Sequence, residues 1–235
     1  MLDVIGWDAR SAATIVGTSA GASTAALVRA GLDGADLVRR ACGEAPTARV
    51  APLLARMGVP LDVTELRSRK SRRVGRRPAS PQLLLRAVRR PLDPRPGLLV
   101  AGLLPEGHIP WSVIAEPIDR VLPDGWPVEP LWLCAARLDG GARVVFGRSA
   151  DDDPAVTVGT AVAASCAVPG FYRPVEIAGR RYVDGGVWSA TNADVLASEP
   201  FDTVVVISPM TVRPARAGRA MHRCACSSVA ISTPR

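Results

Sequence analysis

The sequence predicts an α/β fold in which short apolar strands alternate with helices. Three observations predict it. A β-branched run at residues 14–16 ends at a glycine and passes directly into helix-forming residues. Further apolar strand candidates alternate with helix starts as far as residue 207. The 235-residue chain, with 48% hydrophobic and 22% charged residues, has the composition of one globular domain with a buried core.

Glycine and capping signals set the elements of the first part of the chain. The first strand stops at Gly17, and the helix after it closes at Gly31. Asp33 is a suitable N-cap for a second helix. The expected elements are a strand at 14–16 and helices at 20–29, from 33 to about 42, and at about 53–57.

Turn and proline signals divide the remainder. Residues 67–80 lack apolar periodicity and predict a loop, and Ser80-Pro81 starts a helix through Val88, followed by a Pro- and Gly-rich connection. Two hairpins are expected, across residues 139–141 and 178–179. The remaining expected elements are strands at 131–136, 143–146, 173–177 and 181–183, a helix from 153 to about 166, and a buried strand at 203–207.

The net charge of +7 is local in origin. Ten arginines and lysines lie within residues 67–90, which contain no acidic residue, and the rest of the chain holds 19 basic and 22 acidic residues. The basic segment has no interleaved aromatic residues, so a nucleic-acid partner is not expected. We interpret 67–90 as a solvated loop or as a basic flap that contacts an anionic membrane surface.

A G-x-S-x-G motif lies between the first strand and its helix. At such a strand-to-helix turn the serine hydroxyl projects out of the sheet, and the helix N-terminus favours developing negative charge. The flanking glycines let neighbouring elements approach closely. The motif residues are Gly17, Thr18, Ser19, Ala20 and Gly21.

Asp184 follows the strand candidate at 181–183, where a carboxylate projects from the sheet edge toward Ser19. Gly185 and Gly186 allow a tight turn after it. A carboxylate in that place is able to accept the serine proton during nucleophilic attack. We therefore expect the Ser19 hydroxyl within hydrogen-bonding reach of Asp184.

At these residues the sequence resembles the patatin-like phospholipase family. The resemblance rests on residues 14–22 around the serine, 164–171 in the middle and 182–187 around the aspartate, and it covers residues 13 to about 210. It implies a three-layer α/β/α sandwich and hydrolysis of lipid acyl esters by a Ser-Asp dyad. It further implies Ser19 as nucleophile, Asp184 as proton acceptor, and no metal or other cofactor.

The resemblance also implies a Gly-rich oxyanion loop ahead of the serine strand. Only 18 residues precede Ser19, and Gly6 is the one glycine ahead of the strand. We therefore expect the N-terminal strand and loop of the family to be missing and the chain as given to be a weak enzyme. The alternative is an inactive fragment or a lipid-binding relic of the family.

Two histidines define the enzymatic alternative. An ordinary α/β-hydrolase orders its triad as serine, acid, histidine, which here gives Ser19, Asp184 and His222. The 18 residues before Ser19 are too few for the strands such a fold builds there, and His222 lies in an aperiodic stretch. His108 reads as a loop residue.

The expected organisation is one domain over residues 1–210 followed by an irregular tail over 211–235. The visible chain has no signal peptide and no apolar run long enough to span a membrane, which predicts a cytoplasmic protein, or one peripheral to a membrane. The five scattered cysteines predict reduced thiols.

Overall fold

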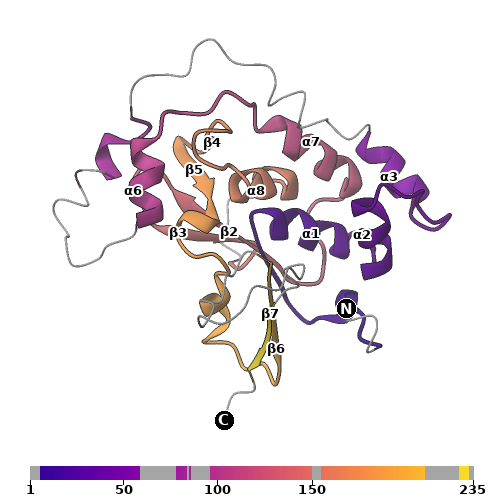
Figure 1. Cartoon of the computed structure of the whole chain (residues 1–235). Helices are drawn as coiled ribbons and strands as arrows, with labels where there is room; N and C mark the ends of the chain where they lie inside the picture. Colours follow the sequence, from indigo (N-terminus) through magenta and orange to yellow (C-terminus); the bar gives the residue numbers. More distant parts are fainter. Residues whose placement is uncertain are drawn as a thin grey trace, which may run out of the picture.

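The structure is a computed structural model that describes residues 6–58, 78–83, 85, 96–149, 155–209 and 228–232. A twisted sheet lies at its centre with helices around it (Figure 1). The α-helices are α1 (Ala20–Arg29), α2 (Gly34–Ala41), α3 (Ala51–Met57), α6 (Pro96–Leu103), α7 (Ser112–Val121) and α8 (Val158–Ser165). Short 3₁₀ helices are η2 (Ala9–Ser11), η3 (Gly185–Val187) and η4 (Ala193–Leu196).

The central sheet is mixed and is organised around β2. Its strands are β1 (Ile15–Thr18), β2 (Leu131–Arg137), β3 (Arg143–Phe146), β4 (Val175–Ile177) and β5 (Arg180–Asp184). The strand β1 runs parallel to β2, whereas β3 and β5 run antiparallel to it and β4 pairs with β5. Because β3 pairs with residues 133–136 of β2, the two strands β1 and β5 share the other edge of β2.

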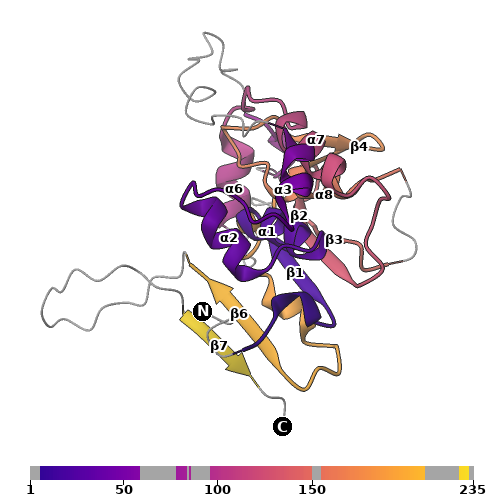
Figure 2. The same cartoon turned by 90° about the vertical axis from the view of Figure 1, so that its right-hand side faces the viewer.

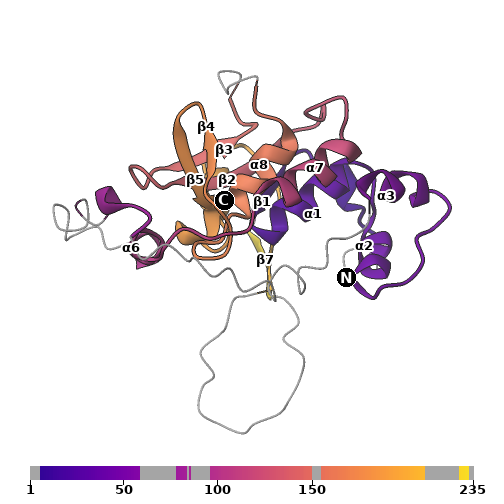
Figure 3. The ribbon, with the colours of Figure 1, turned by 90° about the horizontal axis from the view of Figure 1, so that it is seen from above.

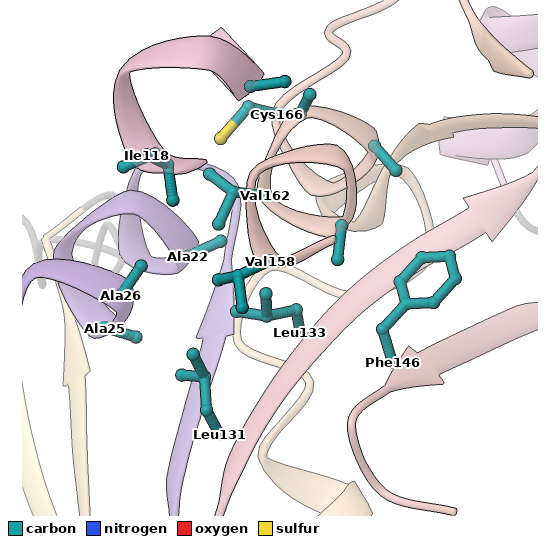
Figure 4. Packing of buried hydrophobic residues seen from close by; sticks show 14 of the residues in the cluster. Ala22, Ala25, Ala26, Ile118, Leu131, Leu133, Phe146, Val158, Val162 and Cys166 are labelled. Atoms are coloured by element: carbon teal, nitrogen blue, oxygen red, sulfur yellow. The ribbon is translucent and has the colours of Figure 1, made fainter. Parts of the chain in front are cut away.

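One face of the sheet carries the main core. Alternate residues of β2 point to opposite faces, and Leu131, Leu133 and Ala135 belong to the large cluster formed with α1, α7 and α8. Figure 4 shows Leu133 of β2 beside Val158 of α8, and Ala22 of α1 beside Val162 of α8. The small residues of α1 and α8 allow these helices to lie close to the strands.

The opposite face is covered by smaller elements. Trp132 and Cys134 of β2 pack with Val195 of η4, and Ala136 packs with Leu98 of α6. Seen from above, α6 lies on one side of the strands and α1, α7 and α8 on the other (Figure 3). The chain is therefore an α/β/α sandwich, as the family resemblance implied.

Most of the elements expected from the sequence are present. The helix α1 has the predicted bounds, and Asp33 caps α2 with a capping box completed by Asp36. The strands β2 and β3 form the predicted antiparallel hairpin. The β4–β5 hairpin turns through Ala178 and Gly179, which both adopt positive φ.

Two expectations about helices were wrong or incomplete. The stretch read as a Pro- and Gly-rich connection contains α6 and α7, since Pro96 begins a helix and Pro117 is accommodated inside one. The helix expected from residue 153 begins at Val158, because Thr157 is its N-cap and accepts from the Thr160 N–H. Residues 155–157 are not helical.

The expectations for the C-terminal region also need correction. The strand predicted at 203–207 is β6 (Val204–Ser208), but Ile207 is 56% exposed, so β6 is not the buried strand expected. It pairs with β7 (Ser228–Ser232) in a separate two-stranded sheet (Figure 2). The segment 211–235, which was expected to be irregular, therefore contains a strand. This strand, β7, hydrogen-bonds with one edge of β6.

Some predictions fall on residues outside the described ones. Most of the basic segment 67–90 does, although residues 81–83 and 85 are helical and Ser80 Oγ accepts from the Leu83 N–H at 3.4 Å. His222, Cys224 and Cys226 also lie there, whereas Cys42, Cys134 and Cys166 are free thiols. In the described ranges no helix is long and apolar enough to cross a membrane.

Candidate active site

Ser19 and Asp184 are hydrogen-bonded. Ser19 Oγ donates to Asp184 Oδ2 at 2.6 Å, so the expected proximity is confirmed. The other carboxylate oxygen, Oδ1, accepts from the Gly186 N–H at 2.7 Å. This second bond orients the carboxylate and leaves Oδ2 facing the serine hydroxyl. A pair with this geometry is able to pass a proton from oxygen to oxygen.

The sheet itself brings the two residues together. Thr18 at the end of β1 lies opposite Cys134, and Asp184 at the end of β5 lies opposite Ala135. Since β1 is parallel to β2 and β5 is antiparallel, their carboxyl ends meet head to head on one edge of β2. The backbone leaves the sheet after Thr18 and again after Asp184, so both turns lie at this point.

Ser19 occupies a strained backbone conformation. Its φ is 55° and its ψ is −127°, a combination that residues with a Cβ rarely adopt. Ser19 is the single residue between the end of β1 and the start of α1, so the chain must turn sharply at this position. Such a turn pushes the side chain out of the sheet, and the G-x-S-x-G motif predicted this feature.

Two consecutive residues at the end of α8 hold the backbone of Ser19. Ser165 Oγ accepts from the Ser19 N–H at 3.0 Å and donates to the Cys134 carbonyl at 2.6 Å. Cys166 Sγ donates to the Ser19 carbonyl at 3.0 Å. Burial raises the pKa of this thiol to about 12, so it keeps its proton and remains a donor. Both backbone groups of Ser19 are therefore satisfied despite the unusual φ.

Asp184 is buried. The residue is 4% exposed. Burial raises the pKa of its carboxyl above the ordinary value, and the hydrogen bonds from Ser19 and Gly186 lower it in part. A carboxylate with a raised pKa is a stronger base than an ordinary one.

The glycines of the two motifs differ in what they do. A Cβ on Gly17 would lie 2.6 Å from Ala22 Cα, and one on Gly185 would lie 2.2 Å from the Cys134 carbonyl oxygen. At both positions a side chain is excluded by backbone. Gly21 differs, because a Cβ there would meet nothing within 4 Å, so the close approach expected at this glycine is not observed. A Cβ on Gly186 would lie 3.0 Å from Asp184 Oδ1.

The N-terminus of α1 directly follows Ser19, which is its N-cap residue. Ala20 and Gly21 are the first two residues of α1, so their N–H groups have no acceptor within the helix. The next amide, that of Ala22, donates to the Ser19 carbonyl at 2.8 Å. The helix dipole adds positive potential at the same end.

Among the described residues, His108 is the one histidine, and it makes no hydrogen bond to Ser19 or Asp184. His108 lies in the loop between α6 and α7, and within the described ranges its buried ring nitrogens have no hydrogen-bond partner. His222 lies outside these ranges, so the triad alternative is not examined by the structure. The described residues contain no group of three or more side chains suited to binding a metal ion.

Three contributors to the site were not singled out from the sequence. Ser165 and Cys166 lie in the segment 164–171 that carries the family resemblance, but nothing in the sequence gives either a role in the site. The third is Asn192, whose side chain contacts both Thr18 and Gly185. A lone asparagine in an aperiodic stretch looks like a turn residue, so no sequence signal marked it.

A sandwich fold with a serine at a strained strand-to-helix turn is an arrangement that serine hydrolases share. Comparison with family models gives a match to the patatin-like phospholipases over residues 12–197. The chain belongs to this family, as the resemblance predicted, and the family acts on lipid esters. Neither the curated proteins nor the solved structures contained a match.

Proposed function

We propose that this chain hydrolyses lipid acyl esters and that Ser19 and Asp184 form its catalytic dyad. The observation that supports this proposal best is the 2.6 Å bond from Ser19 Oγ to Asp184 Oδ2. The hydroxyl donates toward a buried carboxylate that Gly186 holds in place. No histidine is required in such an arrangement, because the carboxylate itself accepts the proton.

The reaction proceeds in two transfers. Ser19 Oγ attacks the ester carbonyl carbon while its proton moves to Asp184 Oδ2, and the resulting tetrahedral intermediate expels the alcohol, which takes that proton from the carboxyl group. Water then attacks the acyl-serine and gives a proton to Asp184. The fatty acid leaves as Ser19 Oγ regains its proton.

The negative charge on the carbonyl oxygen needs donors. The Ser19 N–H is unsuited to this because it donates to Ser165 Oγ. The N–H groups of Ala20 and Gly21 at the start of α1 are the donors we assign to the oxyanion, assisted by the helix dipole.

Exposed apolar side chains on a segment bonded to Asp184 support a lipid substrate, since the Asp184 N–H donates to the Ala167 carbonyl at 3.0 Å. Val168 and Phe171 lie two and five residues after Cys166, and Leu104 lies against Gly170. The helix α6, which ends just before Leu104, packs on η3 directly after Asp184. We call Leu104, Val168 and Phe171 the apolar rim.

We also propose that the basic segment 67–90 contacts anionic membrane surfaces, which would make the protein a cytoplasmic, membrane-peripheral enzyme.

The experiment is ester hydrolysis by purified variants. Ser19→Ala is expected to reduce turnover of a short acyl ester to background, and Asp184→Asn to lower kcat/KM by about 10²- to 10⁴-fold, the usual contribution of a general base. A fluorophosphonate probe should label the unsubstituted chain and not Ser19→Ala.

Histidine variants are the matched controls. His108→Ala and His222→Ala should both retain activity, because a dyad makes no use of imidazole. Loss of activity in His222→Ala with an unchanged melting temperature would favour the triad. A folded chain with no Ser19-dependent hydrolysis would favour the relic.

A further inference from the structure

Asn192 is a polar residue completely enclosed by the protein. It is 0% exposed, and it precedes η4 with φ 49° and ψ 24°, in the left-handed region. Asparagine tolerates this conformation better than other residues with a side chain. A buried amide is costly unless it is hydrogen-bonded, so its contacts are informative.

The amide nitrogen of Asn192 connects the two segments that carry the dyad. Asn192 Nδ2 donates to Thr18 Oγ1 at 3.1 Å and to the Gly185 carbonyl at 3.2 Å. Thr18 directly precedes Ser19, and Gly185 directly follows Asp184. A further contact, at 2.9 Å, is to the carbonyl of Ser189 on the intervening loop.

The oxygen of the Asn192 amide is held by the side chain of an arginine. Arg143 Nη1 donates to Asn192 Oδ1 at 3.3 Å and is itself held by Asp194 at 2.7 Å. The guanidinium also lies over the Trp188 ring, 5.7 Å from its centroid. Because arginine is only a donor, this contact assigns the oxygen of the amide to Arg143 and the nitrogen to Thr18 and Gly185.

The hydrogen bonds of the Asn192 amide, which we call the amide bridge, connect the ends of β1 and β5 to each other, and the sheet does not. In the described part of the chain β1 and β5 pair with β2 and not with each other, although their ends meet. Both strands are held by neighbouring positions of β2, but no ladder hydrogen bond joins the Ser19 and Asp184 segments to each other. The Asn192 amide spans that junction directly.

We propose that Asn192 is a positioning residue that holds the ends of β1 and β5 at a fixed distance, so that the Ser19 hydroxyl stays aligned with Asp184. The proposal rests on the catalytic dyad proposed above. Asn192 does not contact the reacting atoms, and its effect reaches them through Thr18 and Gly185.

The test compares Asn192→Gly with Val195→Ala. The glycine variant accepts the left-handed backbone and removes the amide, whereas Val195→Ala removes packing from the adjacent η4 and leaves the amide bridge intact. For Asn192→Gly, kcat on a short acyl ester should fall about 10- to 100-fold with KM changed less than about threefold, because misalignment affects the chemical step. Val195→Ala should lower the melting temperature and keep kcat within about threefold of the unsubstituted value.

The pH profile gives a readout that a merely structural role would not change. The bond from Ser19 lowers the pKa of Asp184, so its weakening in Asn192→Gly should move the acid limb of kcat/KM to higher pH. Val195→Ala should leave that limb in place.

A double-mutant cycle completes the test. Thr18→Val removes one acceptor of the bridge, and in combination with Asn192→Gly it should add little to the loss. A folded Asn192→Gly with unchanged kcat and pH profile, or losses that add independently in the cycle, would overturn the positioning role while leaving the dyad intact. Turnover that persists in Ser19→Ala would overturn the dyad and this inference together.

Discussion

Asp184 combines two requirements that oppose each other. Proposed as a proton acceptor, it needs to be ionised and to bond to Ser19, yet it is placed among buried groups that disfavour its charge. Two hydrogen bonds offset part of this penalty, and the pKa of the carboxyl remains raised. Burial of Asp184 therefore lowers the stability of the fold and at the same time makes the carboxylate a stronger base.

Asp184→Asn should therefore stabilise the fold while abolishing most activity. A folded-state pKa above the unfolded value means that the ionised carboxylate destabilises the fold, and this destabilisation grows as pH rises from the unfolded pKa to the folded one. The asparagine variant should melt at a higher temperature near pH 7. The gain should shrink as pH falls toward the ordinary carboxyl range of about 3.9.

Thermal melts across pH measure this effect, and Asp124→Asn is the control. Asp124 is exposed, so its replacement should leave the melting temperature nearly unchanged. A lower melting temperature for Asp184→Asn at pH 7 would contradict the argument, since it would mean that the carboxylate stabilises the fold.

At the level of elements, the C-terminal end of α8 supports the turn between β1 and α1. Ser165 is wholly buried and links the Ser19 N–H to the Cys134 carbonyl of β2. Helix, turn and strand are thus joined through one hydroxyl. The strained φ of Ser19 persists because these neighbours determine it.

Ser165→Ala should weaken both stability and catalysis. It leaves a buried N–H and a carbonyl without this partner, which costs about 1–3 kcal/mol of unfolding free energy for such a group. We expect kcat for ester hydrolysis to fall about tenfold as Ser19 moves from its aligned position.

Chemical denaturation and initial rates measure the two effects. Ser23→Ala on α1 is the matched control, because the hydrogen bond that Ser23 Oγ makes to a described side chain is the 3.6 Å one with Cys166 Sγ. Its effect should stay within about 0.5 kcal/mol. Equal losses in the two variants would argue against the special role of Ser165.

The elements that the sequence predicted well are those with local signals. Gly17, Asp33 and the Asp139 to Gly141 turn mark their boundaries through backbone conformation or capping, which depend on few neighbours. The helices α6 and α7 were missed because Pro96 and Pro117 read as helix breakers when tertiary packing is unknown. Packing against the sheet outweighs the propensity there.

The site divides in the same way. Ser19 and Asp184 each lie in a motif with glycines that their turns require, so both were recognised. Ser165 and Asn192 act through contacts 146 and 174 residues distant in the chain, with Ser19 and Thr18 respectively. Such pairs leave no periodicity or turn signal, so the local sequence does not identify them.

Over the whole molecule, the layers place the proposed chemistry beside exposed apolar surface. The sandwich encloses its main core between the sheet and α1, α7 and α8. The apolar rim lies outside this core, on segments that continue from Cys166 and from α6. Phe171 is 47% exposed, a large apolar side chain in contact with solvent. A substrate with a long acyl chain would bury this surface.

Leu104→Ser combined with Phe171→Ser should therefore discriminate between substrates. Burial of acyl carbons contributes about 0.8 kcal/mol per methylene, so loss of two apolar contacts should lower kcat/KM for a long-chain ester about 5- to 30-fold. A short acyl ester that does not reach the rim should be hydrolysed at the unsubstituted rate. The measurement is kcat/KM for both esters in the same mixed micelles.

Val38→Ser is the matched control for that experiment. Val38 is 61% exposed on α2, a helix that does not contribute to the apolar rim, so its replacement removes apolar surface of similar accessibility from another part of the molecule. It should leave both esters unaffected. If Val38→Ser lowered long-chain hydrolysis as much as the rim variant, the preference would reflect general adsorption to micelles. Equal loss on short and long esters in the rim variant would instead place these side chains in the support of the dyad, because only a defect in the chemical step is independent of acyl length.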